Sequence, residues 1–176
     1  GTLKDIKGPD ILVKAFMGIG LSDILKFNLR LFIAGTGPML VDLKRKIDNS
    51  HYKKYIILGG HIPHERICDL YKAADIFVIP SLMEARPLSL SEALFNGLPA
   101  IGSDIDIIKN IISHKDNGLL FNKGDADDLK DKIKMVVQDK EMRSRLGIGA
   151  KQRYRQFYHY NDMLKQYKQH FESIQK

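Results

Sequence analysis

The sequence predicts an α/β protein with a Rossmann-like, doubly wound parallel sheet and helices at its C-terminal end. Two observations indicate this fold class. Short apolar runs alternate with segments whose apolar residues recur at helical spacing, which is the order of parallel βαβ units. The runs are uniformly apolar, as in strands that are buried on both faces, so we expect helices to cover both sides of the sheet.

The length of the chain limits it to one main core. With 176 residues it is long enough for one complete domain and too short for two full-sized ones. Hydrophobic residues make up 44% and charged residues 28%, which is ordinary for a globular protein and argues against disorder. No apolar run approaches the roughly 20 residues of a membrane span, and the first residues do not resemble a secretory signal. The single cysteine, Cys68, cannot form an internal disulfide, which favours a reducing, cytoplasmic setting.

The formal net charge of +7 leaves several anionic partners open. Nucleic acid, an anionic membrane surface and a phosphorylated ligand would each be attracted by a basic protein. A solvated basic surface is an equally good interpretation, because much of the lysine and arginine lies on predicted helical faces or in the last third of the chain. Aromatic residues are not interleaved with a basic groove, so we expect no nucleic-acid binding.

The first predicted elements form one strand–turn–helix unit. Gly1-Thr2-Leu3 reads as the end of a strand whose beginning is missing. Gly8-Pro9-Asp10 opens a helix, because proline fits the first helical turn. Residues 29–34 then form a strand, which Gly35-Thr36-Gly37-Pro38 connects to a helix that ends near Ile47.

The next unit repeats this order. A strand at 55–58 ends at Gly59-Gly60, and a helix follows from His64 to Ala74. The inner face of that helix carries Ile67, Leu70 and Tyr71.

The stretch from Ile76 to Asp104 holds the best candidates for chemistry. A strand at 76–79 leads through a short loop, which contains Glu84, into a helix at 88–96, which carries Glu92. Two acids therefore lie at the same end of the sheet. Open α/β sheets bind ligands there, because strand ends leave a crevice and helix N-termini direct free N–H groups toward it. Taken alone, such a pair could also be the general acid and base of a hydrolase.

The remaining elements complete the sheet and add helices. They are a strand at 100–102, a helix at 107–112, a strand at 118–121 and helices that begin near 125, 140 and 160. Asp125 is the expected N-cap of the first of these last helices, with Asp127 and Asp128 in its first turn, where the helix dipole favours anions.

We expect residues 1–157 to form one domain with a truncated first strand, and residues 158–176 to form a separate C-terminal helix. The final helix has an aromatic stripe at helical spacing, made of Tyr160, Leu164, Tyr167 and Phe171. Such a stripe packs on its own domain or crosses to a second domain that this chain does not contain.

An ordered set of short motifs runs along nearly the whole chain. The motifs are Gly1-Thr2-Leu3, Lys7-Gly8, Gly35-Thr36-Gly37-Pro38, Gly60-His61-Ile62, Tyr71-Lys72-Ala73-Ala74-Asp75, Pro80-Ser81, the pair Glu84 and Glu92, Gly97-Leu98-Pro99, and Gly118-Leu119-Leu120. In this order they resemble the C-terminal half of the family 4 retaining glycosyltransferases. The resemblance implies the GT-B fold of two facing Rossmann-like domains, in which this half binds the nucleotide sugar.

The resemblance assigns roles to three charged residues. Glu92 would accept hydrogen bonds from the ribose hydroxyls, Glu84 would lie beside the donor sugar and take part in catalysis, and Lys7 would stabilise the leaving diphosphate. Each has a plainer interpretation: Glu92 as an acid that complements a helix dipole, Glu84 as a solvated loop residue and Lys7 as a surface lysine.

Three further positions take their predicted roles from the resemblance. Gly35 and Gly37 would form a strand–helix turn that lines the ligand cleft, although any tight turn uses glycine. Ile62 falls where the main chain of the family meets the nucleotide base. We expect no metal at His61 and His64, whose spacing does not suit one.

The chain departs from the family pattern at two positions. Thr2 stands where the family often has a phosphate-binding arginine, and Pro87 removes a backbone N–H ahead of the helix. Arg86 would supply the charge missing at Thr2, and the N–H groups of Leu88 and Ser89 would remain available to phosphate.

These inferences predict a hexosyltransferase that uses a nucleoside-diphosphate sugar, retains the anomeric configuration and needs neither metal nor cofactor. Its partner would be the acceptor-binding N-terminal domain of the same full-length protein. The basic surface suits a lipid-linked or cell-surface glycan acceptor at the inner face of the membrane, which would make any membrane contact peripheral. The alternative is a nucleotide-sugar-binding or scaffold module without turnover, which the substitutions at Thr2 and Pro87 favour.

Overall fold

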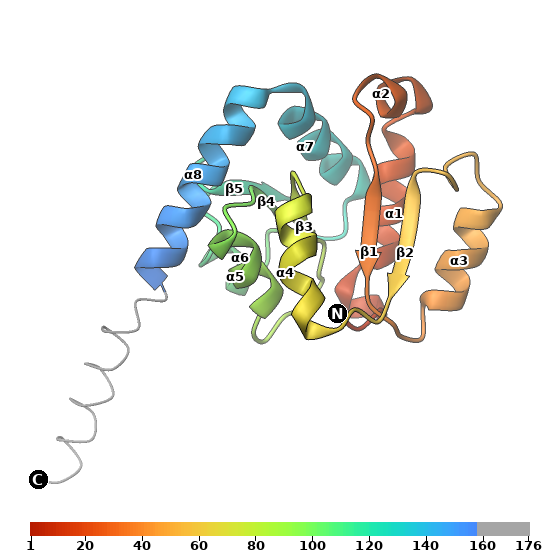
Figure 1. Cartoon of the computed structure of the whole chain (residues 1–176), viewed down its shortest axis with the longest axis horizontal. Coiled ribbons are helices and arrows are strands. Elements are labelled where there is room, and N and C mark those ends of the chain that lie inside the picture. Colours follow the sequence, from red (N-terminus) through yellow and green to blue (C-terminus); the bar gives the residue numbers. More distant parts are fainter. Residues whose placement is uncertain (158–176) are drawn as a thin grey trace, which may run out of the picture.

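The structure is a computed structural model, and it describes residues 1–157 as parallel strands with helices packed around them (Figure 1). These residues contain two sheets, and every strand pair in them is parallel. The first sheet contains β1 (Leu31–Ala34) and β2 (Ile56–Gly60), and the second contains β3 (Phe77–Ile79), β4 (Ala100–Ser103) and β5 (Gly118–Phe121) in that order. The predicted fold class is confirmed.

The helices connect these strands and continue beyond the last one. They are the 3-10 helix η1 (Asp5–Lys7), α1 (Pro9–Gly18), α2 (Leu21–Lys26), α3 (Leu40–Asp48), α4 (His64–Ala73), α5 (Leu88–Phe95), α6 (Asp106–Lys109), α7 (Ala126–Gln138) and α8 (Lys140–Phe157). Within residues 1–157, none of these helices is long and apolar enough to cross a membrane.

Two apolar clusters lie on opposite sides of the strands. Ile101 of β4 packs with α1 and α7, whereas its neighbour Ala100 packs with α5 and α8. Successive side chains of a strand point to opposite faces, so one strand supplies both clusters. The same alternation places Ile79 of β3 in the second cluster and Leu119 of β5 in the first.

The segment Gly1–Leu3 lies beside the end of β1. Thr2 forms a parallel bridge with Thr36, and the N–H of Leu3 donates to the carbonyl of Thr36 at 2.8 Å. The strand character expected of this segment is therefore limited to one bridge.

The expectation that helices cover both faces of the sheet is wrong for β1 and β2. Phe32 and Ile57 are partners in register, and they remain 42% and 48% exposed. Helix α4, which follows β2, contacts other elements: Tyr71 reaches Glu92 of α5 and Phe77 of β3. One face of the two-stranded sheet is therefore open to solvent at these two positions.

Most predicted boundaries agree with the structure to within a few residues, with two exceptions. Helix α2 was not predicted; Gly20 precedes it with a φ of 90°, a left-handed conformation that breaks the chain away from α1. The helix expected at 107–112 is the four-residue α6, after which the chain turns while Ile112 stays buried. The helix expected near Tyr160 and its aromatic stripe lie outside the described residues.

Candidate functional site

Lys7 and Glu84 form an ion pair, although they lie far apart in the sequence. The ammonium Nζ of Lys7 donates to Oε2 of Glu84 at 2.8 Å. Lys7 ends η1, and Glu84 lies in the loop between β3 and α5. The Glu84 side chain is only 7% exposed, so it depends on protein partners for hydrogen bonds that water would otherwise supply.

The second carboxylate oxygen of Glu84 is bound as well. The hydroxyl of Ser81 donates to Oε1 of Glu84 at 2.8 Å. Ser81 is itself held, because the buried hydroxyl of Ser103, at the end of β4, donates to the Ser81 carbonyl oxygen. Two neighbouring strands thereby fix the orientation of this acid.

The loop that carries Glu84 is tied to the segment that carries Lys7. The N–H groups of Leu82 and Met83 both donate to the carbonyl of Ile6, at 2.8 Å and 3.3 Å. Gly8, with a φ of 61°, comes so near that an added Cβ would lie 2.2 Å from the carbonyl oxygen of Pro80. Only glycine fits this left-handed, crowded position, which explains the residue that follows Lys7.

Glu92 is held by a different group. The phenol Oη of Tyr71 in α4 donates to Oε2 of Glu92 at 2.9 Å, and it also lies 3.2 Å from the carbonyl oxygen of Ser89. Burial raises the pKa of Tyr71, and the hydrogen bond to Glu92 raises it further, so the phenol stays protonated as a donor. Glu92 is half-buried and keeps access to solvent.

Both predicted acids follow the carboxyl end of β3. Glu84 lies in the loop after this strand and Glu92 in α5, the helix that the loop opens. The ion pair brings Lys7 to the same loop.

The start of α5 differs in detail from expectation. Pro87 is buried and is the N-cap residue, directly before the first residue of the helix. The N–H of Leu88 donates to the carbonyl of Arg86 at 2.9 Å, so it has a partner within its own turn. Arg86 and Ser89 are exposed beside this turn.

The glycine turn after β1 packs on the first residues of the chain. A Cβ on Gly35 would lie 1.8 Å from the carbonyl oxygen of Gly1, and one on Gly37 would lie 2.5 Å from that of Leu3. Thr2 is exposed beside this turn. The structure thus gives both glycines a packing reason.

The predicted base-contact residue Ile62 follows the second strand. The N–H of Gly35 donates to the carbonyl of Gly60 at 2.7 Å, which holds the turns after β1 and β2 together. Ile62 lies two residues beyond Gly60 and is half-buried.

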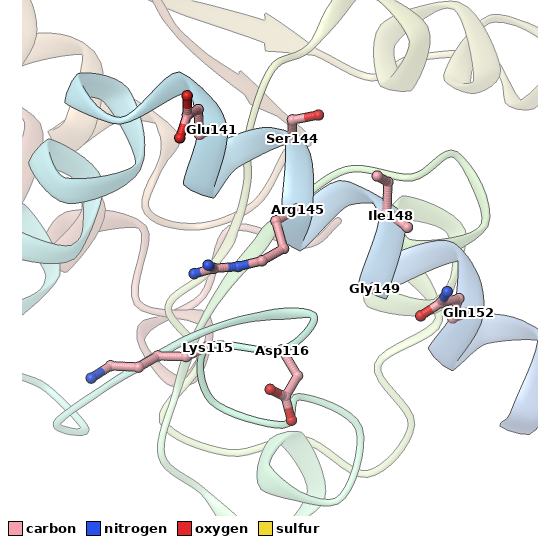
Figure 2. A pocket seen from close by; sticks show the side chains of 8 residues that line it. All are labelled: Lys115, Asp116, Glu141, Ser144, Arg145, Ile148, Gly149 and Gln152. Atoms are coloured by element: carbon pink, nitrogen blue, oxygen red, sulfur yellow. The ribbon is translucent and has the colours of Figure 1, made fainter.

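A separate hollow of about 820 Å³ lies between α8 and the loop before β5 (Figure 2). Side chains of α8 line one side of it, and Lys115 and Asp116 line the other. Charges of both signs meet there, Arg145 and Lys115 against Glu141 and Asp116. It lies by the amino end of β5, whereas open parallel sheets bind ligands at the carboxyl ends, and none of the predicted site residues lines it. We therefore assign the candidate site to the Lys7–Glu84 and Tyr71–Glu92 pairs.

Sequence reasoning missed three supporting residues. Tyr71 and Ser81 lie in the recognised motifs, but neither had a predicted role in the site, and Ser103 had none either. Ser81 directly follows a strand at the ligand-binding edge, which is a usable signal. Ser103 and Tyr71 contact residues 22 and 21 positions away, and helical or strand periodicity cannot pair such residues.

Comparison with known families shows the family of the chain. The sequence model of the family described as "Glycosyl transferases group 1" matches residues 1–153, and the chain belongs to that family. The resemblance inferred from the ordered motifs is thus confirmed.

Named relatives extend well beyond the region that matches. The chain is 26% identical over 155 residues to N-acetyl-alpha-D-glucosaminyl L-malate synthase of Bacillus anthracis, which covers 88% of this chain and 39% of the relative. It is 34% identical over 105 residues to alpha-monoglucosyldiacylglycerol synthase of Streptococcus pneumoniae, covering 58% and 24%. The chain therefore spans less than half the length of these relatives.

Solved structures show the same fold. The chain superposes on HepE of Anabaena, solved in complex with UDP, with a TM-score of 0.87 at 18% identity, covering 98% of this chain and 47% of that one. It superposes on the pneumococcal O-GlcNAc transferase GtfA, solved with UDP and GlcNAc, with a TM-score of 0.83 at 26% identity, covering 98% and 34%.

Proposed function

We propose that this chain is the donor-binding part of a retaining glycosyltransferase, which transfers a hexose from a nucleoside-diphosphate sugar to an acceptor bound by the rest of the protein. The observation that carries the proposal is the pair of oriented acids at one sheet edge. Glu84 is fixed by Lys7 and Ser81, and Glu92 is fixed by Tyr71. Membership of the family and the UDP bound to GtfA support the same ligand class.

In this proposal the two acids recognise different parts of one ligand. Glu92 accepts hydrogen bonds from the ribose hydroxyls, because a carboxylate is an acceptor with two oxygens and can take a vicinal diol. Glu84 lies beside the sugar. The acids are thus not a general acid and base that flank one bond, as in a hydrolase.

Lys7 suits the diphosphate even though it is already paired. An ammonium group has three protons, and one of them binds Glu84. The other two can donate to phosphate oxygens, so the ion pair orients Lys7 without consuming it. The exposed Arg86 and the N-terminus of α5 add positive potential nearby, which offsets the absence of an arginine at Thr2.

The proposed reaction is a front-face displacement without metal or cofactor. The acceptor hydroxyl attacks the anomeric carbon from the side of the leaving diphosphate while the bond from that carbon to the phosphate oxygen breaks. The hydroxyl proton passes to the departing phosphate oxygen, so the nucleoside diphosphate leaves and the configuration is retained. Lys7 stabilises the charge that develops on the leaving group.

The acceptor belongs to the part of the protein that this chain does not span. The named relatives differ in what they modify, since one name specifies L-malate and another diacylglycerol. We propose a cell-surface or lipid-linked acceptor on an N-terminal domain, with peripheral contact to the inner membrane face through the basic surface of a protein of net charge +7.

Nucleotide titration of the full-length protein tests donor binding. Calorimetry with UDP and with GDP is expected to show binding of at least one of them, together with a rise in the melting temperature. Lys7→Ala is expected to weaken that binding by about 10-fold or more, because a hydrogen bond to a charged group contributes about 1.5–3 kcal/mol. Lys4→Ala is the matched control, since Lys4 is an exposed lysine three residues earlier, and it should bind like the wild type.

Two outcomes separate the alternatives. No binding and no stabilisation by either nucleotide would overturn the proposal and favour a scaffold module; binding without sugar transfer to any acceptor would favour a module without turnover. If Arg86→Ala binds the nucleotide as tightly as the wild type while Lys7→Ala does not, then Arg86 does not replace the charge missing at Thr2.

A further inference from the structure

We infer that Tyr71 is a positioning residue for Glu92 and that, through this contact, the site selects nucleotides that have both ribose hydroxyls. The inference deepens the proposed function and rests on it, because it assumes that Glu92 meets the ribose. The role of Tyr71 is inferred from its contacts with α5 and with Phe77.

The phenol of Tyr71 bridges two points of α5. It donates to the side chain of Glu92 at 2.9 Å and lies 3.2 Å from the main-chain carbonyl of Ser89, one turn earlier. A flexible acid on a helix surface samples several rotamers. Here one carboxylate oxygen is held at a fixed distance from the helix backbone, and this fixes the direction of the other oxygen.

Tyr71 is itself held in place. Its ring packs on that of Phe77 with centroids 6.0 Å apart and planes tilted by 58°. Phe77 begins β3, the strand whose far end leads to the Ser81 and Glu84 loop. The phenol remains protonated because burial and the nearby carboxylate both raise its pKa, so Tyr71 always acts as the donor in this pair.

The orientation of Glu92 increases the affinity only of a ligand that hydrogen-bonds to Glu92. When Glu92 is fixed before binding, the ribose hydroxyls meet a preformed acceptor and pay no cost for ordering the side chain. A nucleotide without those hydroxyls gains nothing from the orientation. Loss of the phenol should therefore weaken binding of a ribonucleotide selectively, whereas loss of simple packing would weaken all nucleotides alike.

The test combines two variants with two ligands. Affinities of the full-length protein are measured by calorimetry for UDP and for 2′,3′-dideoxy-UDP, with the GDP pair used if GDP binds more tightly. Tyr71→Phe keeps the ring that contacts Phe77 and removes only the hydroxyl. We expect it to weaken UDP binding about three- to tenfold, the range for one lost hydrogen bond, and to leave dideoxy-UDP binding unchanged.

A double variant separates positioning from packing. Once Glu92→Ala is present, adding Tyr71→Phe should not weaken UDP binding further, because Glu92→Ala already removes the carboxylate that the phenol holds. Tyr55→Phe is the control. The Tyr55 ring packs against Arg30 and has no predicted role in the site, so this variant should leave both affinities unchanged. Melting temperatures of all variants show whether a variant has lost its fold. A variant that has done so is replaced by Glu92→Ala alone, which lacks the acceptor for the ribose hydroxyls and should bind UDP and dideoxy-UDP equally.

Equal losses for both ligands in Tyr71→Phe, or no loss for UDP, would overturn the inference. Wild-type protein that binds UDP and dideoxy-UDP equally would overturn it too and would leave the donor-binding proposal standing. If the wild type binds neither UDP nor GDP, the proposed function fails, and this inference fails with it.

Discussion

At the scale of single residues, Glu84 is the group whose surroundings matter most. Its side chain is 7% exposed, and its two oxygens accept from Lys7 and Ser81. A buried carboxylate that loses one donor retains its desolvation cost without full compensation. Ser81 therefore stabilises the acid and holds it in the orientation that the proposed chemistry requires.

Ser81→Ala tests this role. We expect a loss of about 1 kcal/mol in the free energy of unfolding, as for one buried hydrogen bond. We also expect turnover to fall about 10-fold, because misplacing a group near the chemistry by about an ångström can cost up to about 100-fold. Urea unfolding and the rate of sugar transfer by the full-length protein are the measurements.

Ser50→Ala provides the comparison for that prediction. Its hydroxyl, just after α3, donates to the Ile47 carbonyl at 2.8 Å and accepts from the N–H of Tyr52 at 3.2 Å, so the variant loses hydroxyl hydrogen bonds in another part of the fold. Stability should fall by a similar amount while turnover stays unchanged. Turnover in Ser81→Ala that equals the wild-type rate would contradict a positioning role.

The sequence singled out the charged residues of the candidate site but not the residues that hold them. Lys7, Glu84 and Glu92 lie in recognisable motifs, so their positions could be predicted. Their supporting contacts come from packing between elements, and a sequence pattern carries no record of which helix faces which. Gly8 illustrates the limit: its motif was recognised, but the approach of Pro80 that requires glycine became visible only in the structure.

At the scale of elements, the cap of α7 is the clearest agreement between sequence and structure. Asp125 was predicted as the N-cap, and its carboxylate accepts from the N–H groups of Asp127 and Asp128 at 2.9 Å and 3.0 Å. Two of the four unpaired donors at the helix start are thereby satisfied.

Replacing this cap should lower the free energy of unfolding by the amount typical of a lost N-cap. Asp125→Ala is expected to lower the free energy of unfolding by about 1 kcal/mol, and Asp125→Asn, which can still accept, should keep most of it. Asp131→Ala changes an exposed acid of the same helix and should have a smaller effect. Urea unfolding measures all three, and equal losses for Asp125→Ala and Asp131→Ala would contradict the capping role.

Element types were predictable where periodicity was strong, and less so where tertiary packing decides. The apolar runs gave all five strands, and the spacing gave most helices. Helix α2 spans only six residues, which is too short for a clear period. The exposure of Phe32 and Ile57 could not be foreseen, because it depends on which helices pack on that face of the sheet, and the sequence pattern does not say this.

At the scale of the whole molecule, one apolar cluster joins the two sheets. It contains Ile33 and Ile56 from β1 and β2 together with Ile101 and Leu119 from β4 and β5. Helices α1 and α7 pack against each other over these strands, so the two sheets share a core despite their separate hydrogen-bond ladders.

We therefore expect residues 1–157 to unfold in one cooperative transition. Leu129 of α7 is 0% exposed in the shared cluster, and Leu129→Ala should lower the free energy of unfolding by about 2–5 kcal/mol while keeping a single transition. Far-ultraviolet circular dichroism and tyrosine fluorescence should give the same urea midpoint. Val41→Ala, at a position that is 75% exposed on α3, should change stability by less than about 0.5 kcal/mol. Two separate midpoints would show that the sheets unfold independently.

The loop between β3 and α5 contains positions that the fold fixes and exposed positions that can be changed, which matters for protein engineering. Glu84 points inward, and the loop backbone is anchored to the carbonyl of Ile6, whereas Met83, Ala85 and Arg86 are exposed beside it. In the proposed function, a combinatorial library at Met83 and Ala85 varies the surface beside the donor sugar and leaves Arg86 and the anchors in place. The loop is thus a natural starting point for changing the sugar that the proposed transferase would use.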